Sequence, residues 1–234
     1  MKKIMVAVTM LIAVTGMAFS QEEKKSRTVI EVSGGMIPGR FGVEGLAELS
    51  PFGPDFYASV SHVAENSFTW NARLMAGISP MLSDWDYKDY ATCNGYNLSN
   101  YDNDPSHFAF GFGIGYSPVT SNKRTISLLL SGLVFNSSYS YKHEADSDSS
   151  VSSKTNNYNV KTNTSVFMVG PQVQYVRTFG SHFSLYVDSS IMYAMSGYFH
   201  YEIEDSTASA KVKNTLGVSG GLLYPLSFGL AWKF

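Results

Sequence analysis

Large apolar residues alternate with small or polar residues over most of this sequence. In the C-terminal stretch LSFGLAWKF, every second residue from Leu226 to Phe234 is apolar, and the residues between them are serine, glycine, alanine and lysine. A period of two places successive side chains on opposite faces of a β-strand. Eight segments carry this alternation: 30–36, 56–60, 68–78, 108–116, 126–134, 167–175, 183–201 and 216–234. The pattern predicts an all-β protein.

The segment HFAFGFGIGY, residues 107–116, indicates what each face of these strands contacts. Its large residues, from Phe108 to Tyr116, share one face, whereas an alanine and glycines occupy the other. In a soluble sandwich the large residues would face the core and leave the tiny ones in water, where they contribute little to strand formation. In a narrow membrane barrel the large residues face lipid, and the small ones make room for larger lumen side chains. We therefore expect a membrane barrel rather than a soluble barrel or sandwich.

Segment 183–201 is expected to keep one parity throughout. Phe199 and Tyr201 then share the outward face with Phe183, and His200 and Glu202 share the lumen face. His200 and Glu202 are two ligand types that zinc accepts, but no third candidate lies nearby. We therefore expect a wet rim position for this pair and no metal site.

Two further segments are expected to bend. From Leu216 to Phe234 one parity continues with a weak position at Gly220, and Pro225 marks a bulge or bend within it. In segment 126–134 the alternation is expected to change parity near Phe135, as a β-bulge would cause. The length of 216–234 exceeds the ~9–11 residues of a membrane crossing, so this strand is expected to project beyond the bilayer.

The connections between the segments alternate in length. Short ones span 64–67, 117–124 and 179–182, and longer, more polar ones span 37–54, 80–106, 142–159 and 204–210. Bacterial membrane barrels have short periplasmic turns, long extracellular loops and an even number of strands. We therefore predict a closed antiparallel up-and-down transmembrane β-barrel of eight strands, with ten strands as the alternative, and with both termini in the periplasm.

The N-terminus carries the features of a secretory signal peptide. Lys2 and Lys3 precede an apolar run, and Ala18-Phe19-Ser20 places small residues where signal cleavage requires them. We expect residues 1–20 to be the signal peptide and residues 21–234 to form one outer-membrane β-barrel domain. An N-terminal membrane anchor is the alternative, and the small-residue site argues against it.

Charge and cysteine content exclude several classes of protein. The formal net charge is −2, only 15% of residues are charged, and Cys93 is the one cysteine. No clustered basic face for nucleic acid is present, and an internal disulfide framework is impossible. No segment after the signal peptide is apolar for the ~18 residues of a transmembrane helix. A closed barrel is then the membrane structure available to this chain, because lipid tolerates no unpaired sheet edge.

The C-terminus resembles the terminal assembly signal of bacterial outer-membrane β-barrel proteins. That signal reads polar-x-Gly-x-x-aromatic-x-aromatic, and Ser227, Gly229, Trp232 and Phe234 match it in order. Size and strand count are similar to those of the small eight-stranded barrels of the OmpA and OmpX type. The resemblance implies location in the bacterial outer membrane, contact with its lipid, recognition by the barrel-assembly machinery and a monomeric state.

A second resemblance covers SDWDYKDY, residues 83–90, in the longest outer loop. It is similar to the acidic stretch of omptins, the outer-membrane proteases, in which a carboxylate pair helps to activate water. Asp84 and Asp86 supply carboxylates here, but Leu82 occupies the position of the first omptin aspartate, and no Asp-x-His occurs in the chain. General acid–base work needs its groups within reach of one water. We expect at most a degenerate omptin-like site or a loop ligand site, and no enzyme.

Three charged residues have lumen parity: Glu31, Arg73 and Asp188. They could form a polar pore, but side chains just fill the interior of an eight-stranded barrel. We therefore expect a buried polar network in which at least one of these charges is paired, because a buried unpaired charge is costly.

The sequence supports three hypotheses about function. The first is a non-enzymatic outer-membrane protein with a structural, adhesive or surface-interaction role, whose long loops hold an extracellular ligand. The second is a small pore or transporter for small or apolar molecules. The third is a degenerate omptin-like protease. No cofactor, metal or nucleic-acid partner is expected in any of them.

Overall fold

The computed structural model describes residues 26–43, 46–49, 54–78, 92–93, 96–97, 106–143, 157–206 and 210–234. Every regular element in these ranges is a strand, and no helix long and apolar enough to cross a membrane lies within them. The strands are β1 (Arg27–Met36), β2 (Gly39–Val43), β3 (Leu46–Leu49), β4 (Pro54–Val63), β5 (Phe68–Ile78), β6 (Thr92–Cys93), β7 (Tyr96–Asn97), β8 (Ser106–Thr120), β9 (Arg124–His143), β10 (Tyr158–Phe179), β11 (Phe183–Ser190), β12 (Met192–Asp205), β13 (Ala210–Leu223) and β14 (Leu226–Lys233).

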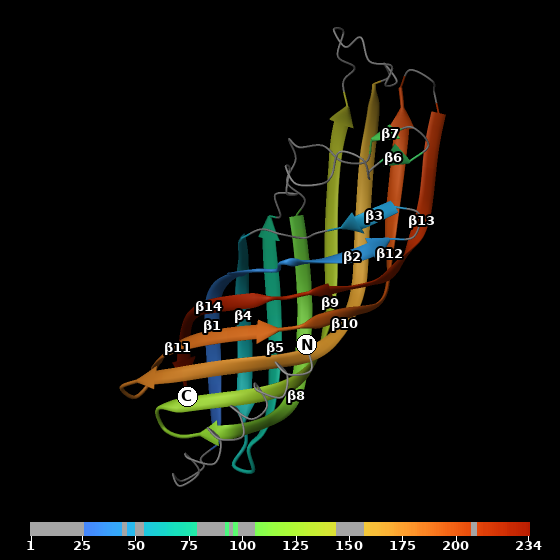
Figure 1. Ribbon diagram of the computed structural model, residues 1–234. Coiled ribbons are helices and arrows are strands. Elements are labelled where there is room, and N and C mark those ends of the chain that lie inside the picture. Colours follow the sequence, from blue (N-terminus) through green and yellow to red (C-terminus); the bar gives the residue numbers. More distant parts are fainter. Residues whose placement is uncertain are drawn as a thin grey trace.

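Eight strands close into an antiparallel barrel (Figure 1). Their order around the barrel is β1, β4, β5, β8, β9, β10, β11 and β14, and β14 pairs back with β1. The last residues of the chain therefore form the seam, where Phe228 lies opposite Gly34 and Trp232 lies opposite Ile30. The prediction of a closed eight-stranded barrel is confirmed, and the ten-strand alternative is wrong.

The short connections all lie at one end of the barrel, which we call the turn end. They join β4 to β5, β8 to β9, and β10 to β11, and the C-terminus lies at the same end. Two of the predicted segments are split in the structure. Segment 183–201 covers β11 and β12, which are separated at Ile191, and segment 216–234 covers β13 and β14, which are separated at Tyr224 and Pro225. The break expected at Pro225 is therefore present.

A belt of outward-facing apolar side chains surrounds the closed part of the barrel. On β8 the large residues from Phe108 to Tyr116 are all exposed by 48–49%. The alternate residues Ala109, Gly111 and Gly113 point inward and are buried. The same outward face continues on the neighbouring strands with Leu74, Leu130, Phe167, Val173, Phe183, Phe228, Leu230 and Trp232. The face that the sequence assigned to lipid is thus the outer face of the barrel.

Beyond this belt, one side of the barrel continues as a taller sheet, which we call the extension (Figure 1). Strands β9 and β10 contain 20 and 22 residues, about twice the length of a tilted membrane crossing. At this level β10 pairs with β12, β12 pairs with β13, and β13 pairs with β2 of the β2–β3 hairpin. The hairpin lies in the stretch 37–54, where the sequence indicated only a loop.

The polarity of the outward-facing and the inward-facing side chains reverses at the boundary between belt and extension. The last outward row with apolar side chains contains Phe108 and Tyr198 beside Asn136 and Ser165, and the next outward row is Ser106, Ser138, Asn163 and His200. Inward-facing residues change in the opposite sense, from Ser127 and Ser131 below to Leu133 and Phe135 above. The extension therefore has a polar exterior and an apolar interior, as a soluble barrel has.

The expected parity change near Phe135 is wrong. Strand β9 pairs with β10 without a register shift from Arg124 to His143, and Phe135 is buried on the same inward face as Ser131. No bulge is needed there, because the sequence itself places apolar residues inward and polar ones outward once the strand leaves the belt. The large side chain at Phe135 was misread as an outward residue.

The single parity expected for segment 183–201 is also wrong. The pairing of β12 with β10 shifts register beside Met195, so that Phe167 lies opposite Ser196 and Met168 lies opposite Ala194. This bulge turns Phe199, Tyr201 and Ile203 into the interior. His200 and Glu202 consequently face outward, not into the lumen.

A second bulge, in β13, reverses which residues of the strand face inward and which face outward. Its register against β2 shifts between Val218 and Gly221, and Gly220 and Gly221 have φ angles of 107° and 141°, which favour glycine. Leu216 and Val218 pack against the interior cluster of the extension, whereas Leu222 and Tyr224 are exposed in the belt. The weak position at Gly220 was therefore the point at which the single predicted parity ends.

Candidate functional site: the filled lumen

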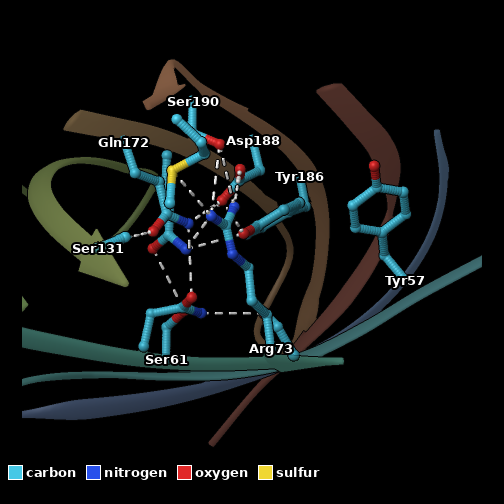
Figure 2. A network of polar contacts seen from close by, with 12 residues as sticks. Tyr57, Ser61, Arg73, Ser131, Gln172, Tyr186, Asp188 and Ser190 are labelled. Atoms are coloured by element: carbon cyan, nitrogen blue, oxygen red, sulfur yellow. Dashed lines mark hydrogen bonds and ion pairs between the residues drawn. The ribbon is translucent and has the colours of Figure 1, made fainter. Parts of the chain in front are cut away.

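An ion pair crosses the centre of the lumen. Arg73 on β5 donates from Nη1 to Oδ1 of Asp188 on β11 over 3.1 Å, and both side chains are almost fully buried. In the closed barrel these two strands lie on opposite sides of the ring. The arginine therefore bridges the barrel wall to wall. Figure 2 shows its guanidinium group in the middle of the polar network.

The Asp188 carboxylate collects donors from three further side chains. Its Oδ2 atom accepts from the Tyr186 hydroxyl over 2.9 Å, from the Gln174 amide over 3.1 Å and from the Gln172 amide. Hydrogen bonds to the charged form offset the loss of hydration that burial imposes on a carboxylate. Asp188 is thus the centre of the network, and its partners come from β10 and β11 as well as from β5.

Small polar side chains extend the network to the walls. Asn71 donates to Ser59 and Ser61 at 3.1 Å and 3.0 Å, and Ser61 donates to Gln174 over 3.3 Å. Ser131 on β9 donates to the Gln172 carbonyl, and Arg73 donates to Ser190 over 3.3 Å. The chain of hydrogen bonds connects β4, β5, β9, β10 and β11, so the lumen at this level is filled by side chains (Figure 2).

The glycines of β8 provide the space for Arg73. A Cβ atom built on Gly111 would lie 2.8 Å from Arg73 Nε and 2.9 Å from Arg73 Cγ, closer than real Cβ atoms approach their neighbours. A Cβ atom on Gly113 would collide with Ser131. The small residues of HFAFGFGIGY are therefore required by the larger side chains that cross the lumen in front of them.

Glu31 lies in the same lumen but at the edge of the network. Its carboxylate interacts with Tyr186 and Ser59, and it is near both Asp188 and Arg73. Within the described part of the chain its Oε2 atom has no hydrogen-bond partner. The structure thus brings together all three charged residues that the sequence placed in the lumen, and it pairs Arg73 with Asp188 directly.

A second buried pair, which sequence reasoning missed, lies near the boundary with the extension. His107 Nε2 on β8 contacts Asp55 Oδ1 on β4, and the imidazole stacks on Phe135 with ring centroids 5.5 Å apart. The intervening strand contributes Gly77, which is opposite both Asp55 and His107 in the register. A residue without a side chain between them lets the carboxylate and the imidazole meet.

The four residues of the predicted assembly signal lie on β14 or directly after it. Ser227 is buried in the lumen, Gly229 packs against the backbone of Val32 and Ser33 on β1, and Trp232 and Phe234 are exposed on the outer face. The Phe234 amide donates to the Thr28 carbonyl over 2.9 Å. The signal residues therefore form the closing seam of the barrel.

Asp84 and Asp86, the candidates for a loop ligand or a degenerate omptin-like site, lie outside the described residues. In the ranges that the structure does describe, no group of three or more His, Cys, Asp or Glu side chains is arranged to hold a metal ion. His200 instead hydrogen-bonds to Thr215 over 2.8 Å and lies 3.6 Å from Glu202 on the outer face of the extension.

The outer face of the extension carries two polar features. Lys211 lies 2.5 Å from Glu204 and 3.7 Å from Glu202, and hydrogen bonding to this ammonium group lowers the pKa of the Glu204 carboxyl in a region beyond the belt. A groove of about 620 Å³ follows the boundary with the belt, lined by hydroxyl and amide groups that include Ser138 and Asn163, and by Tyr198 and His200.

Together, the closed ring, the apolar belt and the filled lumen define an eight-stranded barrel of the outer-membrane type. No protein-family model matches the sequence, and no curated protein sequence matches it significantly. Among solved structures, the fold is similar to that of a major outer membrane protein from Thermus thermophilus, with a TM-score of 0.52 and 13% identity over 89% of this chain and 99% of that chain.

The outer membrane protease OmpT from Escherichia coli is more distant, with a TM-score of 0.37 and 8% identity over 91% of this chain and 97% of that chain. The β domain of the Bordetella autotransporter BrkA has a TM-score of 0.26 and 7% identity over 88% of this chain and 99% of that chain. The likeness to the Thermus protein establishes the fold alone, and neither of the other two bears on function.

Proposed function

We propose that this chain is an exported, integral outer-membrane protein with a non-conducting barrel and a structural or surface-interaction role, without enzymatic activity. The observation that carries this proposal is the filled lumen, in which Arg73 and Asp188 join opposite walls. An ion or small solute would have to break several buried hydrogen bonds to pass. The pore or transporter hypothesis has no comparable support.

The apolar belt and the closed edge support the membrane part of the proposal. A ring with no free edge satisfies its backbone groups in lipid, and the belt exposes aromatic and aliphatic side chains on every side of it. Residues 1–20 supply the export signal, and the seam strand β14 supplies the signal for the barrel-assembly machinery. The protein would then act as a monomer in contact with outer-membrane lipid.

The extension supports the surface-interaction part. The extension is a sheet with a polar outer face that lies beyond the lipid. Its outer face carries the charged cluster of Glu202, Glu204 and Lys211, and the groove lies at its base. An extracellular ligand would meet this sheet and the long loops before it met the membrane.

Planar-bilayer recording tests the closed lumen. The refolded wild-type protein is expected to give no discrete conductance steps, and the triple variant Arg73→Ser, Gln172→Ser, Asp188→Ser is expected to give small ones, because the groups that fill the lumen are removed. Discrete steps from the wild type would overturn the proposal in favour of a pore.

A fluorogenic dibasic peptide tests the absence of proteolysis. We expect no cleavage above the buffer rate by the refolded protein, and the same result for Asp84→Ala. Cleavage by the wild type that is lost in Asp84→Ala would instead establish the omptin-like hypothesis.

Deleting Phe234 tests recognition by the assembly machinery. The shortened protein is expected to refold in detergent with the wild-type yield, because one terminal residue adds little to the seam, but to reach the outer membrane of cells poorly. Folded barrels of this kind are expected to run at an altered mobility on gels without boiling, which measures both yields. Equal amounts in the membrane would contradict the assigned signal.

A further inference from the structure

A small cavity at the turn end gathers two cationic side chains. It has a volume of about 180 Å³ and is lined by Arg27, Lys233 and Phe234 together with Thr120 and the β8–β9 turn at Ser121 and Asn122. Arg27 comes from the first strand and Lys233 from the last, which are neighbours at the seam, whereas the β8–β9 turn comes from the far side of the ring. The cavity is therefore a feature of the closed barrel.

Arg27 is buried in this cavity with most of its donors unused. Its side chain follows the inward parity of Val29 and Glu31 and is only 6% exposed. Nη1 donates to the Ser121 carbonyl over 2.6 Å, but Nε and Nη2 find no partner among the described residues. A guanidinium group presents its donors as a planar fork that suits two oxygens of one anion. Nε and Nη2 are such a pair, although neither atom is accessible to solvent while the guanidinium stays in its present position.

Lys233 adds a second positive charge from the opposite side of the seam. Its ammonium group donates to the Asn122 carbonyl over 3.3 Å, and it is close enough to Arg27 for the two charges to repel each other. The described residues that line the cavity contribute no side-chain carboxylate. Two like charges placed together, one of them buried with donors left over and the other partly exposed, are stabilised when an anion binds between them.

We propose that this cavity binds a phosphate group: the Arg27 guanidinium turns its unpaired Nε and Nη2 toward two of the phosphate oxygens, and Lys233 holds a third. A tetrahedral oxyanion offers more acceptor oxygens than a carboxylate and matches three donors from two directions. The site lies beside Trp232 and Phe234, which are exposed on the outer face at the same end, where a membrane barrel meets lipid headgroups. The phosphate can thus come from a free anion or from a phospholipid headgroup.

Calorimetric titration of the refolded protein in a phosphate-free, non-ionic detergent tests this site at constant ionic strength. Inorganic phosphate is expected to bind at one saturable site. Arg27→Met and, independently, Lys233→Met are each expected to weaken binding at least tenfold, so the test survives if one variant fails to refold. Arg177→Met is the matched control, since Arg177 is an exposed arginine stacked over Phe179, and its affinity should equal that of the wild type.

A second titration identifies the source of the phosphate group. Dihexanoyl phosphatidylglycerol, added below its micelle concentration, is expected to compete with inorganic phosphate if the headgroup is the ligand and to leave phosphate binding unchanged if a free anion is the ligand. Either result is consistent with a phosphate-binding site in this cavity.

Two outcomes overturn the proposal: no saturable binding, or wild-type affinity in Arg27→Met. Neither of these outcomes depends on whether the lumen conducts, so this site and the closed-lumen proposal can fail separately.

Discussion

Arg73 shows how one residue determines the state of the lumen. Its burial is tolerable because Asp188 neutralises it and Ser190 accepts from both Nη1 and Nη2, although Nε has no partner among the described residues. Asp188 in turn depends on Arg73, since the other groups around it are neutral side chains and the carboxyl of Glu31, which carries the same sign of charge. The pair is therefore strongly coupled, and removing one partner leaves the other charge buried without compensation.

Replacing Arg73 by methionine is expected to lower the free energy of unfolding by about 3–5 kcal/mol, the usual cost of breaking a buried ion pair from one side. Urea unfolding in lipid vesicles, followed by tryptophan fluorescence, measures it. The double variant Arg73→Met, Asp188→Leu is expected to recover most of the loss, because no charge is then left unpaired. A double variant as unstable as the single one would contradict this coupling.

Two glycines that look alike in the sequence are expected to respond differently to valine. Gly111 faces Arg73, so Gly111→Val overpacks the lumen and should cost about 1–3 kcal/mol. Gly132 faces outward, and a Cβ there would meet Phe167 at an ordinary 3.5 Å, so Gly132→Val should change stability by no more than about 0.5 kcal/mol. The same unfolding measurement compares them, and equal costs would refute the assigned faces.

Parity alone identified Glu31, Arg73 and Asp188 as lumen residues, because each lies next to a large apolar residue in its own strand and therefore points to the other face of the sheet. The contact between Asp55 and His107 was not predictable in this way. The two residues are 52 positions apart, and they meet only because Gly77 lies between them in the sheet. That arrangement depends on the register of three strands, which alternation within one strand does not specify.

At the scale of the element, the bulges in β12 and β13 explain where sequence reading failed. Alternation without a bulge places residues that are an even number of positions apart on the same face. It therefore predicted that Phe199 faces outward like Met195 and that Leu216 faces outward like Leu222. The structure inserts a bulge at each boundary. The physical reason is that lipid favours large apolar residues outside, whereas water beyond the belt favours them inside.

Phe199→Ala is expected to loosen the extension without opening the barrel. A buried aromatic truncated to alanine costs about 3–5 kcal/mol, and Phe199 belongs to the buried cluster that fills the extension and reaches Tyr57 and Met75 of the barrel below it. Limited trypsin digestion of the protein in vesicles should then cleave rapidly at Lys211 and Lys213, while the belt strands stay protected. Tyr198→Ala, a change at the adjacent outward position, should leave the cleavage rate unchanged; equal sensitivity would place Phe199 outside the core.

At the scale of the whole molecule, the chain is a membrane barrel continued by a water-facing sheet. The eight strands and the alternation of short and long connections were predictable, because closure and even strand number follow from the pattern and from the demands of lipid. The extension was only partly predictable. Period two reveals that a strand has two faces, but the solvent around each level of the barrel determines which face turns outward.

An arginine placed on the outer face is expected to distinguish the two levels. Phe112→Arg, in the belt, should cost about 2–4 kcal/mol in lipid vesicles, the depth-dependent penalty for a charge near the midplane. Asn163→Arg, in the first outward row beyond the belt, should cost close to nothing, because the side chain stays in water. Equal costs at the two positions would show that the belt does not mark the span of the membrane.

The wall-to-wall contact in the lumen also constrains the order of assembly. Arg73 and Asp188 are separated by 115 residues and lie on opposite sides of the ring, so they meet only when β5 and β11 are both part of it. Until then Arg73 faces water and needs no counterion. The lumen can lose its water only when the last hairpin docks, which makes dehydration of the interior a late event and ties it to completion of the seam. A chain stalled before that step would be an open, hydrated sheet, and its rate of closing would depend on the two charges finding each other.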